Sequence, residues 1–332
     1  MLNKLNYNFS RYIAGQSKGH YESFFQRANH PNKPFAFWIR YTVFNPLENP
    51  DNAIGELWAI FFNGNTNEHI SVKTEFPMSK CDFNNNSFNV NVGDAIINNT
   101  ILKGTSTFDG NSIEWNLSYK ASDDPLYLFP KKFYDMSFPK AKALVGVPLA
   151  NYSGEIIVND NKWCINNWIG SQNHNWGSQH TDRYAWGQVA GFDNYPNSFL
   201  EIATAQIKVG GFYIPKMTIA VIRVDDKEYL FNSLIKSIIN KATYKYFEWN
   251  FSLSNGAEKL TGTIKAEKQC FVGLNYYNPP GGNKTCLNTK IAFANVSLTL
   301  KNGEIIDLLT NNKAAFEILT NDNSHGIQVN SF

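Results

Sequence analysis

The chain has 332 residues, of which 43% are hydrophobic and 17% charged, which excludes a disordered chain and suits two domains of about 150 residues or one large domain. Thirty basic and 28 acidic residues leave a formal charge of +2, and no basic run exceeds the pair Lys131 and Lys132, so a nucleic-acid partner is not expected. Aromatic residues make up 15%; so many rings favour pleated sheets and can also line a wide cavity.

The sequence has no features of membrane insertion or export. No hydrophobic run approaches the roughly 20 residues that span a bilayer, and residues 1–15 lack the apolar stretch of a signal peptide. The cysteines are widely spaced and form no Cys-x-x-Cys pair: Cys81, Cys164, Cys270 and Cys286. These features predict a cytoplasmic protein with reduced thiols and no zinc site.

Short runs rich in β-branched and aromatic residues recur along the chain and predict strands. They cover residues 35–44, 54–63, 87–92, 113–119, 155–158, 163–169, 184–192, 199–209, 217–224, 244–253, 261–267 and 290–300. This pattern predicts an all-β, antiparallel protein with one or two short helices. The strongest helical signal follows Asp225 and Asp226, which could cap a helix, because apolar residues recur there at helical spacing: Leu230, Leu234, Ile235, Ile238 and Ile239.

The chain also contains an internal repeat. Residues 113–118 (Ile-Glu-Trp-Asn-Leu-Ser) resemble residues 247–252 (Phe-Glu-Trp-Asn-Phe-Ser). Matching the two halves pairs tryptophan and glutamate residues of corresponding strands: Trp38 with Trp186, Glu56 with Glu201, and Trp115 with Trp249. Two β domains, residues 1–180 and 181–332, explain the repeat. Chance similarity in a chain rich in Asn and aromatic residues is the alternative.

Motifs that identify common enzyme classes are absent. There is no Gly-x-x-x-x-Gly-Lys, Gly-x-Gly-x-x-Gly or His-Glu-x-x-His, which argues against kinases, dehydrogenases and zinc proteases. Residues 170–177 (GSQNHNWG) gather amides, an imidazole and an indole where the first repeat ends. His174 could act there as a general acid or base, or it could hold an interdomain turn together with Asn175. A metal site with His180 lacks a third ligand and is not expected.

Three glutamates in apolar strands are candidates for a proton donor. Glu22 lies in an aromatic strand, and a carboxyl in an apolar pocket has a raised pKa. A salt bridge from Glu22 to Arg27 or Arg40 is the alternative. Glu56 and Glu201 occupy matching positions of the repeat and pose the same question, which the sequence leaves open.

Two motifs resemble a known superfamily. Residues 19–25 (GHYESFF) and 172–177 (QNHNWG), the latter followed by Trp186-Gly187, are similar to the lipocalin-like superfamily of carotenoid 1,2-hydratase (hydroxyneurosporene synthase), tocopherol cyclase, AttH-type proteins and lipocalin-like Diels–Alderases. The resemblance implies two lipocalin-like β-barrels packed side by side. It also implies cofactor-free hydration, cyclisation or cycloaddition of a hydrophobic substrate.

The resemblance further implies roles for individual residues. A His followed two residues later by a Trp in the hydratases matches His174 and Trp176, and an acid on an early strand of the second barrel matches Glu201. Three departures separate this chain from the known enzymes. Glu201 stands where the hydratases have Asp, Asn173 stands where an acid often precedes the His, and Glu22 lies in Tyr-Glu-Ser instead of the Glu-Gly-Trp of the cyclases.

Together, the residues and the resemblance predict a lyase or isomerase of the cyclase or hydratase kind, acting on a polyene, isoprenoid or prenylated molecule in an aromatic-lined cavity. The expected catalytic residues are Glu201, His174 and Glu22. Substrate contacts are expected from Trp176, Asn175, Asn173, Tyr21, Phe25, Trp168 and Trp186. The expected partner is this hydrophobic molecule, with loose membrane association for access to it. The alternatives are a non-catalytic carrier and an interaction domain with exposed aromatic patches.

Overall fold

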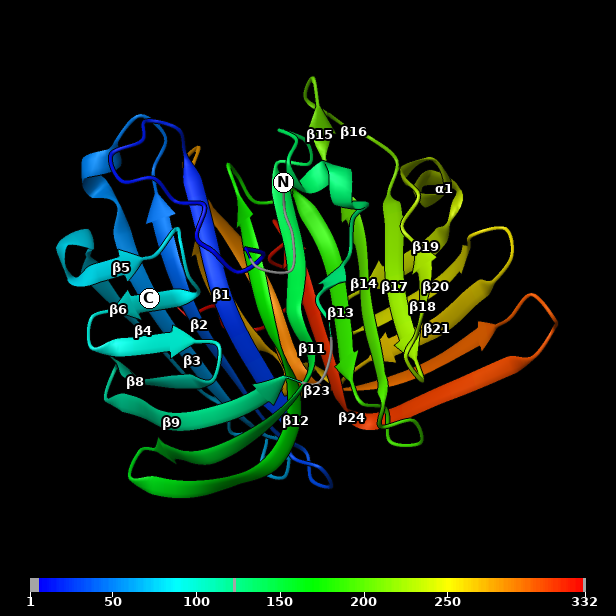
Figure 1. Ribbon diagram of the computed structural model, residues 1–332, viewed down its shortest axis with the longest axis horizontal. Coiled ribbons are helices and arrows are strands. Elements are labelled where there is room, and N and C mark those ends of the chain that lie inside the picture. The colour runs from blue at the N-terminus through cyan, green and yellow to red at the C-terminus, as the bar shows by residue number, and fades with distance from the viewer. Residues whose placement is uncertain (1–5, 122–123, 331–332) are drawn as a thin grey trace.

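The computed structural model describes residues 6–121 and 124–330, which form two antiparallel β-sheets (Figure 1). The first sheet has twelve strands: β1 (His20–Asn29), β2 (Phe35–Asn45), β3 (Ile54–Asn63), β4 (Ile70–Pro77), β5 (Cys81–Phe83), β6 (Asn89–Val92), β7 (Ala95–Asn98), β8 (Ile101–Phe108), β9 (Asn111–Ala121), β10 (Leu126–Tyr127), β11 (Ala141–Val158) and β12 (Asn161–Gly177). Their order is β4-β3-β2-β1-β12-β11-β9-β8-β7-β6-β5, and β10 pairs with β11.

The second sheet has ten strands: β13 (Arg183–Ala190), β14 (Ser198–Gln206), β17 (Met217–Val224), β18 (Lys227–Phe231), β19 (Lys241–Lys245), β20 (Glu248–Ser254), β21 (Lys259–Lys265), β22 (Val272–Tyr277), β23 (Asn283–Thr299) and β24 (Ile305–Thr320). Their order is β18-β17-β14-β13-β24-β23-β21-β20-β19, and β22 pairs with β23. A separate hairpin joins β15 (Lys208–Val209) to β16 (Phe212–Tyr213). The expected boundary near residue 180 falls between β12 and β13, and its status as a domain boundary stays a prediction.

Helical structure is sparse, as the sequence predicts. The described residues contain one α-helix, α1 (Leu234–Ile239), and four short 3-10 helices: η1 (Pro50–Asn52), η2 (Met78–Lys80), η3 (Lys131–Tyr134) and η4 (Lys268–Cys270). No helix within residues 6–121 and 124–330 is both long enough and apolar enough to cross a membrane.

The predicted start of the helix is wrong. Asp225 and Asp226 both have positive φ angles, 48° and 66°, and form the tight turn between β17 and β18. Two left-handed residues match the twist of a two-residue hairpin, so these aspartates end a strand and do not cap a helix. Leu230 consequently lies in β18, and Ser233 precedes the helix.

Two other predicted segments differ in the structure. Residues 170–177 are the end of the long strand β12, so His174 and Asn175 do not lie in an interdomain turn. The strand predicted over residues 244–253 is interrupted at Phe247, whose φ angle of 76° turns the chain between β19 and β20.

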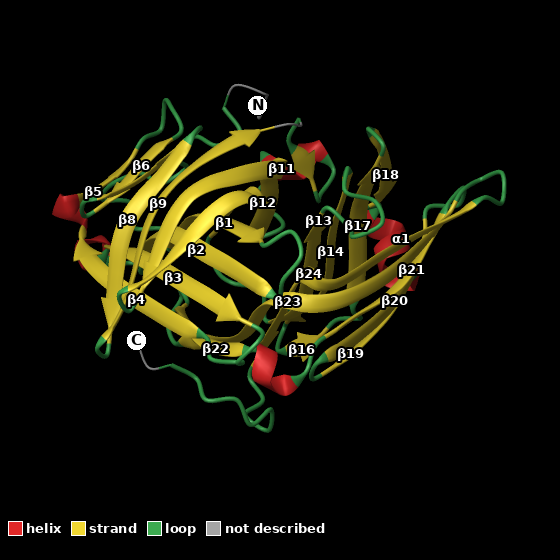
Figure 2. Cartoon of the chain, turned by 90° about the horizontal axis from the view of Figure 1, so that it is seen from below, coloured by secondary structure: helices red, strands yellow, loops and turns green. Residues whose placement is uncertain are grey.

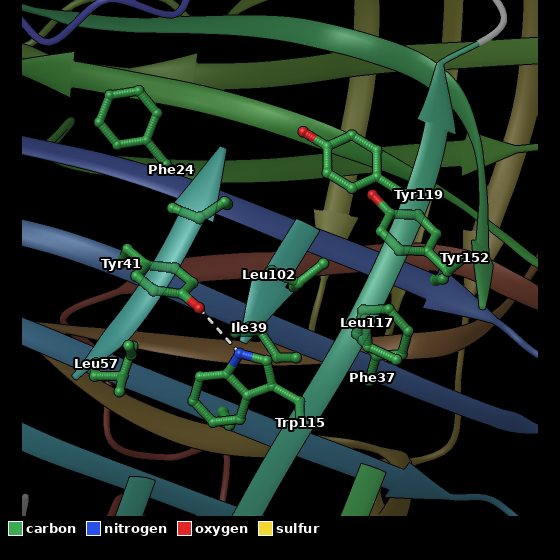
Figure 3. Packing of buried hydrophobic residues seen from close by; sticks show 14 of the residues in the cluster. Phe24, Phe37, Ile39, Tyr41, Leu57, Leu102, Trp115, Leu117, Tyr119 and Tyr152 are labelled. Atoms are coloured by element: carbon green, nitrogen blue, oxygen red, sulfur yellow. Dashed lines mark hydrogen bonds between the residues drawn. The ribbon is translucent and has the colours of Figure 1, made fainter. Parts of the chain in front are cut away.

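The first sheet curls into a nearly closed barrel (Figure 2). Strands β4 and β8 meet where Thr74 Oγ1 lies 3.1 Å from Ser106 Oγ and accepts a hydrogen bond from Thr107 N at 3.0 Å. Aromatic and aliphatic side chains fill the interior (Figure 3), where the Trp115 indole donates to the Tyr41 hydroxyl at 2.9 Å. The all-β fold with two antiparallel sheets is therefore confirmed.

The outer faces of the central strands pack between the two sheets. Along β13, Ala185 and Val189 point into the core of the second sheet, so strand alternation directs Trp186 and Gln188 toward the first sheet. Residues from both sheets form a hydrophobic cluster in this contact: Phe25, Ala36, Trp38, Trp58, Ile60, Phe62, Trp186, Val272, Leu274, Tyr276, Cys286, Ile291, Ala315 and Leu319. The central strands thus have one face in their own core and the other in the contact between sheets.

The strand order repeats between the sheets, but the residue pairs that the sequence predicts between the two halves are displaced by one strand. β1, β2 and β3 hold the places of β13, β14 and β17, and β8 and β9 hold those of β20 and β21. Consequently, the matched pairs lie on strands in different places: Trp38 with Trp186, Glu56 with Glu201, and Trp115 with Trp249. Neighbouring strands share the same alternating aromatic pattern, so a sequence match between halves can slip by one strand.

Buried hydrogen bonds fix the sheets to each other. Arg27 on β1 donates from Nε to Gln188 Oε1 at 2.8 Å and from Nη2 to the Gln188 carbonyl at 3.2 Å. Asn29 donates to the carbonyls of Lys290 at 2.7 Å and Asn312 at 3.2 Å. Because hydrogen bonds are directional, these contacts set the position of one sheet on the other.

Candidate active site between the sheets

Two adjoining cavities lie between the sheets. The inner chamber, about 130 Å³ in volume, is lined by Tyr21, Ser23, Phe25, Trp38, Arg40, Leu128, Phe129, Ala141, Lys142, Ala143, Asn175, His180, Thr181, Tyr184, Trp186, Ala203, Ala205, Tyr276 and Glu317. The outer vestibule, about 370 Å³, is lined by Phe129, Phe138, Pro139, Lys140, Ala141, Gln179, His180, Thr181, Ala203, Ala205, Ile207, Lys208, Met217, Ile219, Leu234 and Ser237. Six residues line both spaces, which together suit a small molecule.

Aromatic rings from both sheets form the walls of the inner chamber. Phe25 packs edge-on against Trp186 with ring centroids 6.1 Å apart, and it lies 6.2 Å from Trp38. Tyr21 stacks on His180 at 4.0 Å. These rings project from alternate positions of β1, β2 and β13, so the same periodicity that buries each core also builds the chamber.

Arg40 is a buried cation of the inner chamber without an acidic partner. It is 6% exposed, and its guanidinium lies 4.6 Å from the Tyr276 ring and 6.0 Å from the Trp38 ring. Among the described residues, Nε has no hydrogen-bond partner and no carboxylate forms an ion pair with Arg40. A buried charge is costly unless it is paired. This arrangement suits a ligand oxygen that is negatively charged or strongly accepting.

Lys142 adds a second cation to the chamber. Its Nζ donates to the Pro139 carbonyl at 2.8 Å, and burial lowers the pKa of Lys142. Glu317 brings an acid to the same chamber, but the Nζ of the fully buried Lys290 lies 2.7 Å from its Oε1. Lys290, which does not itself line the chamber, therefore compensates the charge of Glu317, and the chamber keeps an excess of positive charge.

His180 gives the chamber a neutral imidazole. Burial, reinforced by the charge of Arg40, lowers the pKa of His180 to about 3. The uncharged ring can accept a hydrogen bond near neutral pH while it stacks on Tyr21. Its backbone N–H donates to Asn278 Oδ1 at 3.0 Å, which holds the segment between β12 and β13 in place.

Glu201 lies behind the chamber wall, on the same face of β14 as Ala203. Its carboxylate accepts hydrogen bonds from Trp186 Nε1 and Gln188 Nε2, both at 2.7 Å. Gln188 Nε2 also donates to Asn173 Oδ1 at 2.7 Å, so Asn173 belongs to this buried network. Burial raises the pKa of Glu201 to about 7. Glu201 therefore holds the indole of Trp186 in place and does not itself line either cavity.

The raised pKa of Glu201 makes stability depend on pH. The folded protein binds a proton at Glu201 that the unfolded chain releases above a pKa of about 4.5, so this group's contribution is lost as the pH rises. Relative to Glu201→Gln, the free energy of unfolding of the native protein is expected to fall by about 2 to 3 kcal/mol from about pH 5 to about pH 8. Chemical denaturation at both pH values measures this difference. The surface variant Glu155→Gln should show the same pH dependence of stability as the native protein. If the difference in stability between the native protein and Glu201→Gln were the same at both pH values, the assignment would be contradicted.

Glu22 and His174 pair with each other inside the first barrel and do not line either cavity. Glu22 Oε1 lies 2.7 Å from His174 Nε2, and His174 Nδ1 lies 2.9 Å from the Tyr7 carbonyl. The Glu22 carboxylate also accepts hydrogen bonds from Ser10 Oγ at 2.8 Å and from the backbone N–H groups of residues 11 and 12. This pair therefore anchors the N-terminal segment to the barrel.

The expected raised pKa of Glu22 is wrong. Burial raises the pKa of this carboxyl, but hydrogen bonds and charges from His174 and His20 outweigh that effect and hold it well below its usual range. A carboxyl with so low a pKa is a poor proton donor at neutral pH. The alternative, a salt bridge from Glu22 to Arg27 or Arg40, is also absent from the described contacts, since His20 and His174 take that place.

The other predicted contact residues fall into two groups. Four of them line the inner chamber: Tyr21, Phe25, Asn175 and Trp186. Trp176 packs beside His174 at 4.6 Å, and Trp168 stacks near Phe37 at 6.1 Å. Both tryptophans belong to the packing of the first barrel, and neither lines the two cavities.

Several polar residues of the chamber are missing from the predicted site: Arg40, Lys142, His180, Tyr184, Tyr276 and Glu317. The sequence contains a usable signal for one of them. Like Glu22 in β1, Arg40 is a charged residue within an otherwise apolar and aromatic strand, and it lies two residues after Trp38. His180 lies in the loop between β12 and β13, and the others lie on strands β11, β13, β22 and β24, whose neighbours across the chamber only the fold defines.

Comparisons with known proteins agree with this architecture. No family model matches the chain. Two uncharacterised proteins from strains of Mycobacterium tuberculosis are 26% identical over 189 residues, which is 56% of this chain and 56% of theirs. The chain thus spans little more than half the length of these relatives.

Solved structures match across most of the chain. An AttH protein from Nitrosomonas europaea has a TM-score of 0.56 at 11% identity and covers 91% of this chain and 92% of its own. Kievitone hydratase from Nectria haematococca has a TM-score of 0.59 at 15% identity and covers 92% and 89%. The chain has the lipocalin-like fold. CghA has a TM-score of 0.58 at 9% identity, and the match covers 92% of this chain and 88% of CghA. It shares this lipocalin-like architecture, and the predicted resemblance is confirmed at the level of the fold.

Proposed function

We propose that this lipocalin-like protein is an enzyme of the hydratase or cyclase kind that acts on a small hydrophobic molecule between its two sheets. The observation that carries the proposal is Arg40, a buried guanidinium without an acidic partner in a chamber walled by aromatic rings. The structural likeness to kievitone hydratase supports the same class of reaction. A cytoplasmic location and a cofactor-free reaction stay predictions of the sequence.

The charge of the chamber favours a reaction that develops negative charge on oxygen. A carbocation about 6 Å from Arg40 would be destabilised by about 3 kcal/mol at an effective dielectric constant of about 20. A cation–π contact with the walls would return only about 0.5 to 2 kcal/mol. An enolate or phenolate oxygen at the same distance is stabilised by the same amount of Coulomb energy. We therefore favour a carbonyl- or phenol-bearing substrate over proton-initiated cyclisation of a simple isoprenoid hydrocarbon.

The residues that line the chamber then have distinct roles. Arg40, with Lys142, binds and polarises the substrate oxygen, which activates a conjugated double bond toward addition. In a hydration, the water oxygen bonds to the β-carbon while the π electrons move onto the substrate oxygen, and the proton that the water loses is then transferred to the α-carbon, which restores the carbonyl. His180 can accept a hydrogen bond from that water. In a cycloaddition, the aromatic walls hold the folded substrate, and no proton needs to move.

Glu201 acts in this proposal as a positioning residue for Trp186. The roles predicted for His174 and Glu22 are not required, because both residues lie inside the barrel, on the opposite face of their strands from the chamber.

An Ala203→Phe variant tests the location of the reaction. Ala203 lines both the chamber and the vestibule, so a phenyl ring there is expected to obstruct passage and lower turnover by at least about tenfold. The substrates are a panel of prenylated phenols and polyenyl ketones, with products identified by liquid chromatography and mass spectrometry. The exposed Ala257→Phe is the matched control and should retain native turnover, and circular dichroism reports whether either variant keeps its fold.

The panel also separates the enzyme from a carrier. A compound that binds to the native protein, is displaced by Ala203→Phe and is recovered chemically unchanged would support carriage of an apolar molecule instead of catalysis. Turnover that Ala203→Phe leaves at the native rate would place the reaction outside these cavities.

A further inference from the structure

An exposed apolar surface lies beside the vestibule. Its members are Phe212 at the tip of the β15–β16 hairpin and three isoleucines of α1, and their exposed fractions are 82% for Phe212, 84% for Ile235, 53% for Ile238 and 74% for Ile239. We call these four residues the apolar rim. Figure 1 places the hairpin and α1 at the same, upper edge of the molecule.

The orientation of α1 is the reverse of an ordinary surface helix. Leu234 and the buried Ser237 line the vestibule, whereas the isoleucines at helical spacing from each other face outward. A helix that only covers the protein would expose polar residues on that side. The outward isoleucines therefore require another explanation, and large exposed apolar patches mark interaction sites.

The segments that carry the hairpin and the helix meet beside the vestibule. Lys216, just after the hairpin, places its Nζ 4.7 Å from the ring of Tyr244 on β19, immediately after the helix. α1 packs on β17. Lys208 and Met217 line the vestibule together with Leu234.

The charges around the rim are all of one sign along both segments. Residues 207–217 and 232–246 contain five lysines and no acidic residue: Lys208, Lys216, Lys236, Lys241 and Lys245. Lys208, Lys241 and Lys245 are exposed. Asp182 is an acid close to this edge, where it accepts from Lys208 N at 2.9 Å and pairs with Lys284 at 3.5 Å. Glu258 is a second acid near the helix, where it accepts from Asn255 Nδ2 at 2.6 Å. The surface thus combines apolar side chains with an excess of lysines.

We propose that the apolar rim and its lysines dock the protein on an anionic lipid surface, with the vestibule mouth facing the bilayer. Side chains such as Phe and Ile insert at the level of the headgroups, and lysines bind acidic headgroups. A hydrophobic substrate dissolved in the bilayer would then enter the vestibule without crossing water. This inference is independent of the reaction, because it concerns binding alone.

Flotation with vesicles tests the proposal on the 332-residue chain. The native protein is expected to float with vesicles of phosphatidylglycerol and phosphatidylcholine in equal parts, and weakly with phosphatidylcholine alone. The triple variant Phe212→Ser, Ile235→Ser and Ile239→Ser is expected to bind at least about tenfold more weakly. The double variant Lys241→Gln and Lys245→Gln should lose the preference for the anionic vesicles.

A matched control uses exposed isoleucines elsewhere on the chain. Ile13 and Ile305 are 65% and 60% exposed, and the double variant Ile13→Ser and Ile305→Ser should float like the native protein. Failure of the native protein to float, or an equal loss in this control, would overturn the proposal. A native dimer that the triple variant converts to monomers, without any vesicle binding, would also overturn it by identifying the rim as a contact between copies.

Discussion

An Arg40→Met variant is expected to turn over substrate about two orders of magnitude more slowly than the native protein while keeping its fold. Methionine is close to arginine in length and can retain the packing against Tyr276, but it removes the charge that we propose polarises the substrate oxygen. Initial rates measured by chromatography and mass spectrometry give the loss. Because a buried cation without a partner is costly, the variant should unfold at the same temperature as the native protein or a higher one.

Two further variants make this result specific. Arg223→Met removes an arginine of β17 that pairs with Glu228 at 2.8 Å and does not line the chamber, so native rates are expected. Arg40→Lys keeps the charge and should recover part of the lost activity, although it presents fewer donors to a substrate oxygen. Native turnover by Arg40→Met, or an equal loss in Arg223→Met, would exclude the proposed role.

The second large effect concerns stability. Glu22→Ala is expected to destabilise the protein by about 3 to 5 kcal/mol, since it removes the acceptor shared by His174, His20, Ser10 and two backbone N–H groups and leaves buried donors unpaired. The melting temperature should fall by roughly 4 to 7 °C. Differential scanning calorimetry measures both quantities. Glu155→Ala, which breaks a surface pair with Lys162, should leave stability close to that of the native protein.

The effect of Glu22→Ala should also depend on pH. The folded protein holds the pKa of Glu22 below its unfolded value, so its stabilising contribution is complete above about pH 5 and is lost as the pH falls further. The difference between native and variant proteins should therefore be largest near neutrality and shrink in acid. A difference that grows on acidification would contradict the assignment of Glu22 as an ionised anchor.

The sequence predicts the fold well because its strongest pattern is local. Alternating apolar residues and turn signals define most strands without reference to distant contacts. The errors occur where one local signal has two meanings. Asp225 and Asp226 suit both a helix cap and a hairpin turn, and only their positive φ angles decide for the turn. The repeat is visible, yet identical alternation in neighbouring strands hides its true register.

The chamber is harder to predict, because the two faces of a strand are equivalent in sequence. Ser23 and Glu22 are adjacent, but Ser23 lines the chamber and Glu22 faces the barrel interior. Asn175 and His174 divide in the same way. Without the knowledge of which face meets the second sheet, the motif at 172–177 looks like one site although the structure divides it between two environments.

The bonds from Arg27 and Asn29 to the second sheet have a consequence for selectivity. With the two halves locked at a set angle, the chamber cannot adjust its outline by swinging one half against the other. A flexible substrate must then adopt the shape of the cavity, and the loss of conformational entropy falls on the substrate instead of the protein. Discrimination among similar molecules would follow from how readily each one adopts that shape, more than from how many contacts it makes once inside.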